Sequence, residues 1–82
     1  MLAVDSSAIG SVGVLTIGTR GGGGPGEVRI KIRGGSETFI AWSDSPLPKG
    51  TTVLVIEERG RRAVNVMEWA SDPLSELGNY GG

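Results

Sequence analysis

The stretch of chain that most constrains the fold covers residues 46–57. Pro46 and Pro48 exclude a helix on the approach, because proline fixes φ and lacks a backbone N–H. Gly50 permits a tight turn, and the β-branched and aliphatic run that follows it is typical of a buried strand. The sequence therefore predicts a turn that leads directly into a strand.

A second strand follows after a short polar break. Residues 58–61 interrupt the apolar run, and alternation resumes over 63–67, which together indicate a hairpin. Alternation places one face of each strand inward. The predicted inward residues of this hairpin are Val53, Val55, Val64 and Val66.

Three further strands are predicted upstream. The first covers 8–17 and contains two glycines, which favours a bulge or bend that lets one strand pair on both sides of a small barrel. Residues 18–26 are rich in glycine and are expected to form a mobile loop. The second strand, 27–33, alternates throughout and places Val28, Ile30 and Ile32 in the core.

The third strand covers 37–43, after a short connection at 34–36. The strand order predicts an all-β domain, a five-stranded OB-like Greek-key barrel with disordered termini. An SH3-like barrel is the alternative that composition leaves open. The predicted divisions are a disordered N-terminal segment at 1–8, the barrel at 9–69 and a flexible C-terminal tail at 70–82.

Composition excludes most enzyme classes. The 82 residues contain no cysteine and no histidine, so a thiol nucleophile, a zinc–thiolate site and the commonest general base are missing. We expect no enzyme activity, no cofactor, no metal and no small-molecule substrate. The net charge of -1 gives no overall field that attracts nucleic acid or an anionic membrane. No apolar run approaches the roughly 20 residues that span a bilayer, so the chain as given is expected to be soluble.

Two local patterns suggest binding. The glycine run at 21–26 resembles a loop that binds phosphate through its backbone N–H groups. It lacks the lysine and the following helix that a phosphate loop needs, so it is interpreted as a flexible loop. Arg29, Lys31 and Arg33 form a basic row beside Ile40 and Trp42, and OB barrels that bind single strands combine such rows with aromatic side chains. Against that hypothesis, acidic residues lie close to the row and a charged outer strand face is ordinary.

Other charged residues receive weaker assignments. Arg59, Arg61 and Arg62 cluster at the predicted hairpin turn and are kept as a secondary contact site. The acidic residues are interpreted as solubilising surface charges, because no spacing pairs two of them on one rigid surface. These are Asp44, Glu57, Glu58, Glu68 and Asp72.

Residues 9 to 68 also resemble a known family. The similarity rests on turn and core positions, which are Gly10, Gly13, Thr16, Pro25, Gly26, Val28, Phe39, Ala41, Lys49, Gly50, Val53 and Val55. At these positions the chain resembles the C-terminal soluble domain of the NfeD-like family. It departs from the family at Gly18 and Thr19, where an apolar residue is usual before Arg20, and in a loop lengthened by glycines.

The resemblance implies a non-enzymatic interaction module. It implies an OB-like barrel on the cytoplasmic side of the cell membrane, held there by helices of a longer parent protein and acting with stomatin- or flotillin-like scaffold proteins. It also implies that Phe39 and Ala41 lie in the core, which turns Ile40 and Trp42 outward by alternation. Trp42 is then expected to be substantially exposed in a partner surface. The predicted interaction surface is Arg29, Lys31, Arg33, Ile40, Trp42, Arg59 and Arg61. Single-stranded nucleic-acid binding is the alternative function.

Overall fold

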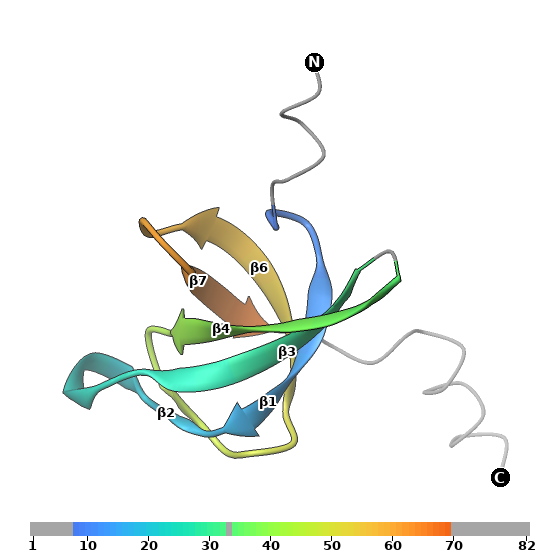
Figure 1. Ribbon diagram of the computed structural model, residues 1–82. Coiled ribbons are helices and arrows are strands. Elements are labelled where there is room, and N and C mark those ends of the chain that lie inside the picture. The colour runs from blue at the N-terminus through green and yellow to red at the C-terminus, as the bar shows by residue number, and fades with distance from the viewer. Residues whose placement is uncertain (1–7, 33, 70–82) are drawn as a thin grey trace, which may run out of the picture.

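The computed structural model describes residues 8–32 and 34–69. These residues form seven β-strands and one short 3-10 helix (Figure 1). The elements are β1 (Val12–Ile17), β2 (Thr19–Arg20), η2 (Gly21–Gly23), β3 (Gly26–Ile32), β4 (Gly35–Trp42), β5 (Pro46–Leu47), β6 (Thr52–Glu58) and β7 (Ala63–Glu68). Of the predicted terminal segments 1–8 and 70–82, residues 1–7 and 70–82 lie outside the described residues, so the predicted domain boundaries stay predictions.

The five longer strands close into a barrel in the order β1-β3-β4-β7-β6, with β6 pairing back to β1. All neighbours are antiparallel except β4 and β7, which run parallel over three residue pairs. A chain that places its third long strand beside its fifth in this way has the Greek-key order of an OB barrel. The predicted fold class is confirmed, and the SH3-like alternative is excluded by this order.

The core is filled by one inward side of each long strand. Val28 and Ile30 of β3 are completely buried. The four valines predicted inward on β6 and β7 are each at most 3% exposed. Ala41 is buried and Phe39 packs against the core from its edge. Each fully buried aliphatic side chain stabilises the fold by roughly 1.5–3 kcal/mol, so this interior accounts for the barrel's stability.

The prediction that Ile32 belongs to the core is wrong. Its side chain is 42% exposed, although it has the same parity as Ile30. Ile32 pairs with Gly35 at the end of the β3–β4 hairpin, whereas the register between β1 and β3 ends at the pair Gly13 and Ile30. The hairpin therefore projects past the barrel, and none of the described strands covers its inner side there (Figure 1).

β1 is bent, as predicted, although the bulge lies nearer its end than its glycines do. The register with β3 shifts between Leu15 and Ile17. Gly26, the first residue of β3, lies directly against the chain that leaves this bend. A Cβ on Gly26 would overlap the carbonyl oxygens of Ile17 and Gly18. Only glycine allows the two chain segments to cross so closely.

The glycine-rich segment 18–26 has more structure than a mobile loop. β2 pairs with β5 through Thr19 and Leu47, and the turn η2 is closed by a bond from the Arg20 N–H to the Gly24 carbonyl at 2.9 Å. This small sheet was not predicted, because each of its strands has only two residues and shows no alternation in the sequence.

Candidate functional site

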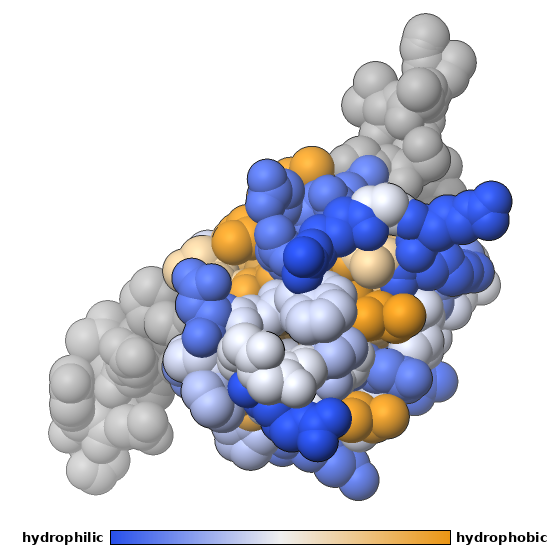
Figure 2. Space-filling view, turned by 90° about the vertical axis from the view of Figure 1, so that its left-hand side faces the viewer, coloured by the Kyte–Doolittle hydropathy of each residue, from blue (hydrophilic) through white to orange (hydrophobic). Residues whose placement is uncertain are grey.

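A groove of about 810 Å³ opens on the outer surface where β4 ends beside β7. One wall is formed by η2 and the segment 43–45, and the floor by outward side chains of β4, β6 and β7. Trp42 and Asn65 face each other across the parallel pair of strands. Figure 2 views the molecule from the side where η2 lies, and its apolar side chains appear as islands within a largely hydrophilic surface.

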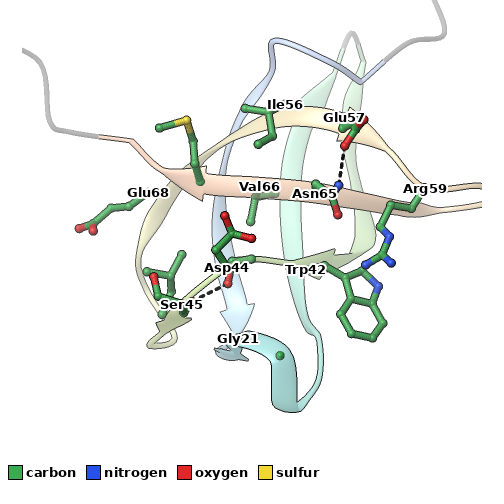
Figure 3. Close-up of a pocket in the computed structure, with 14 residues that line it drawn as sticks. Gly21, Trp42, Asp44, Ser45, Ile56, Glu57, Arg59, Asn65, Val66 and Glu68 are labelled. Carbon is green, nitrogen blue, oxygen red and sulfur yellow. Dashed lines mark hydrogen bonds between the residues drawn. The ribbon is translucent and has the colours of Figure 1, made fainter.

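One end of the groove is formed by Trp42 and Arg59. The Arg59 guanidinium carbon lies 4.6 Å from the centre of the Trp42 ring, within the range of a cation–π contact. Figure 3 shows the two side chains together at this end. Trp42 points outward as predicted, but it is half-buried rather than substantially exposed, because Arg59 covers its ring.

A chain of hydrogen bonds fixes the wall of the groove. The Leu47 N–H donates to Thr19 Oγ1 at 3.0 Å, and Ser43 Oγ donates to the Ser45 carbonyl at 2.7 Å. Thr19 Oγ1 and Ser43 Oγ are also bonded to each other. Because each hydroxyl has one proton, Thr19 donates to Ser43 in this chain. Thr19 is only 4% exposed, so this buried hydroxyl holds the segment after β4 against β2.

Three carboxylates border the groove along its length. Asp44 stands on the wall segment, Glu57 lies beside β7 and Glu68 lies at the end away from Trp42 (Figure 3). Asn65 Nδ2 donates to Glu57 Oε1 at 2.7 Å, which fixes that carboxylate. The cation among the lining residues is Arg59, so the groove is acidic overall.

Apolar side chains lie between these charges. Ile56 and Met67 line the groove and are each 47% exposed. Ile56 falls at the bulge of β6, where the register with β7 shifts between Val55 and Glu57. The groove therefore offers an aromatic ring, two aliphatic contacts and an excess of negative charge in one concave surface.

The basic row lies on a different face. Arg29 and Lys31 are exposed on the outer side of β3, opposite Thr38 and Ser36 of β4, and Arg29 Nε donates to Ser36 Oγ at 3.2 Å. With Val14 of β1 they line a smaller pocket of about 510 Å³. Arg33 lies outside the described residues.

Trp42 is distant from the basic row along β4. It follows Thr38, the partner of Arg29, by four residues, a separation of about 13 Å in a strand. The outward pair between them is Glu27 and Ile40, and Ile40 is exposed as predicted. The structure therefore separates the aromatic residue from the cations with which it was expected to act.

The three hairpin arginines diverge. Arg59 lies in the groove, and Arg61 is exposed at the turn. Arg62 Nη1 forms an ion pair with Glu37 Oε1 at 3.3 Å, and the Arg62 carbonyl accepts from the Ile40 N–H at 2.8 Å. Arg62 therefore helps to close the barrel between β4 and β7 and contributes little to a common basic surface.

The groove contains no recognisable catalytic arrangement among its lining residues. Within 8–32 and 34–69, no group of three or more acidic, histidine or cysteine residues is placed to hold a metal ion. In the same part of the chain, no helix has the length and apolar character needed to cross a membrane.

Four residues of the groove and its wall were not predicted as site residues, which are Thr19, Asp44, Glu57 and Asn65. A signal was present for Thr19, a hydroxyl at a position where the resembling family usually has an apolar residue. Asp44 and Glu57 were interpreted as scattered surface charges, since sequence spacing cannot reveal that β4 and β7 run side by side.

The family model of the NfeD C-terminal domain matches residues 12–67. This range begins with β1 and ends one residue before the end of β7, so it covers the barrel except for Glu68. No curated protein and no solved structure matches the chain.

Proposed function

The chain belongs to the NfeD C-terminal domain family, and on that premise we propose that it is a non-enzymatic protein-interaction module. In this proposal it is the soluble, cytoplasmic domain of a membrane-anchored NfeD-like protein, and it acts with stomatin- or flotillin-like scaffold proteins. The barrel binds its partner through preformed outer surfaces and makes or breaks no covalent bond.

The observation that carries this proposal is the amount of apolar surface left outside a filled core. Nine large apolar side chains of the described residues are at least 42% exposed. Two of them, Val12 of β1 and Met67 of β7, flank the half-buried Leu54 of β6, so that three apolar residues adjoin across neighbouring strands. Adjoining apolar residues on the outside of a small domain are typical of a surface that contacts another protein.

Single-stranded nucleic-acid binding is supported less well. That function needs aromatic side chains for base stacking beside cations for the phosphates. Here Trp42 lies in a groove bordered by Asp44 and Glu57, and the basic pair Arg29 and Lys31 lies on another face. Phosphates would meet carboxylates at the only described aromatic residue that lines the groove.

The proposal is tested with the labelled 82-residue chain and amide NMR spectra. Addition of a purified stomatin- or flotillin-like protein is expected to broaden or shift signals of outward barrel residues. A mixed-sequence single-stranded oligonucleotide is expected to leave the spectrum unchanged at near-physiological salt, where phosphate contacts are weak. Saturable oligonucleotide shifts, with no response to the proteins, would replace this function by nucleic-acid binding.

A further inference from the structure

We propose that the groove beside Trp42 binds a protein segment that presents arginine or lysine next to an apolar residue. The inference rests on the proposed function and adds the place and the chemistry of the contact. The occupant follows from three properties of the groove, which are its charge, its aromatic ring and its apolar floor.

The charge of the groove selects a cationic partner. Asp44, Glu57 and Glu68 border it against the single cation Arg59. Complementary charge across an interface guides association and disfavours partners of like sign. Acidic segments and phosphate backbones are therefore poor occupants, and a basic segment is a good one.

The Trp42 ring already holds a group of the proposed chemistry. Arg59 lies over it at 4.6 Å, so the geometry accepts a guanidinium. Arg59 is exposed at the end of β6, and its backbone N–H is fixed to the Ala63 carbonyl at 2.7 Å. An incoming arginine can take the place of the Arg59 side chain at the ring while the backbone stays in position.

The shape of the groove suits an extended segment. Its floor follows β7, and the exposed side chains of Ile56 and Met67 line it together with Glu57 and Glu68. Side chains of an extended chain alternate, so one cation can meet Trp42 or Glu57 while a neighbouring apolar side chain covers Met67. The wall held by Thr19 keeps this shape formed before binding.

The test uses a short capped peptide in which leucine and arginine alternate, titrated into the labelled 82-residue chain at low salt. The expected result is saturable shifts at Trp42, Ser45 and Asn65, which weaken several-fold as salt is raised to physiological strength. A peptide with glutamate in place of arginine should produce none. Equal shifts with both peptides, or shifts confined to Arg29 and Lys31, would overturn the proposal.

Variants test each property separately. The pair Asp44→Lys and Glu57→Lys should weaken peptide binding at least about fivefold by charge reversal, whereas Glu27→Lys on the β3 face should change it less than about twofold. Arg59→Ala should tighten binding about two- to fivefold, because it frees the ring and removes a like charge. Unchanged affinity in the double variant and in Arg59→Ala would overturn the assignment.

Two other occupants are distinguished in the same experiments. Groove shifts that appear on concentrating the chain without peptide would identify a second copy, and oligonucleotide shifts in the groove would identify nucleic acid. Either result overturns the proposal. If the double variant still binds a stomatin- or flotillin-like protein normally, this inference fails while the proposed function stands.

Discussion

The groove over β4 and β7 differs from the face over β1 and β3 in charge and in construction. The groove is acidic and has a wall formed by η2 and residues 43–45. The buried Thr19 hydroxyl holds this wall in place through its hydrogen bonds. The β1–β3 face carries Arg29 and Lys31, both on β3, and has no such wall among its lining residues. Alternation decides which side chains point outward, whereas topology decides which outward side chains share a concave surface.

The largest effect is expected from Gly26→Ala, which breaks the crossing that positions the groove wall. The added Cβ would overlap two backbone carbonyl oxygens, Ile17 and Gly18, that cannot move aside without shifting β1. We expect a loss of at least about 4 kcal/mol, close to the whole stability of a small domain. Gly22→Ala, in open space on the groove, should cost less than about 1 kcal/mol. Urea unfolding measures both, and equal stabilities would refute the close crossing.

The next largest effect concerns the core beneath the basic face. Ile30→Ala should cost about 2–5 kcal/mol, because the side chain is completely buried. Ile32→Ala, two residues along the same side of β3, should cost less than about 1 kcal/mol, because the projecting hairpin leaves it exposed. If thermal unfolding shows similar losses of stability in Ile30→Ala and Ile32→Ala, the end of the hairpin packs against another group in solution.

Thr19→Val sharpens the comparison at the wall itself. The substitution keeps the shape but leaves the buried Leu47 N–H without its acceptor, which costs about 1–3 kcal/mol. Thr38→Val on the exposed β4 surface should change the free energy of unfolding by less than about 0.5 kcal/mol. An unchanged free energy of unfolding in Thr19→Val would mean that the wall does not depend on this hydroxyl.

The smallest effect is expected where a cation meets the ring. Arg59→Ala removes the contact with Trp42 and should destabilise the chain by about 0.5–1 kcal/mol, with a change in tryptophan emission. Arg29→Ala, on the other face, should leave that emission unchanged. Matching spectra for the two variants would contradict the stacking.

Most of the fold follows from the residues alone. Strict alternation in β3 identified Val28 and Ile30, and the proline-bounded approach to β6 identified the last hairpin. The error at Ile32 has a physical origin, because alternation gives the direction of a side chain and says nothing of where the neighbouring strand stops. The small β2–β5 sheet escaped detection because two-residue strands have no period.

The candidate site was much less predictable. Outward placement of Ile40 and Trp42 could be anticipated only through the family resemblance, which placed Phe39 and Ala41 in the core, and both point outward. The groove could not be predicted, because Trp42 and Asn65 meet through a parallel pairing between strands that lie more than twenty residues apart in sequence. The basic row and the tryptophan were joined in one hypothesis because both were expected on the outer face of neighbouring strands, and their distance along β4 separates them.

The central claim is that partners meet the acidic groove and not the basic face. It is tested most directly by placing a photo-crosslinking amino acid in the natural full-length protein, at Met67 in the groove in one variant and at Lys31 in another. The account predicts crosslinks to a stomatin- or flotillin-like protein from the Met67 position and few or none from Lys31. Crosslinks to that protein from Lys31 alone would contradict it.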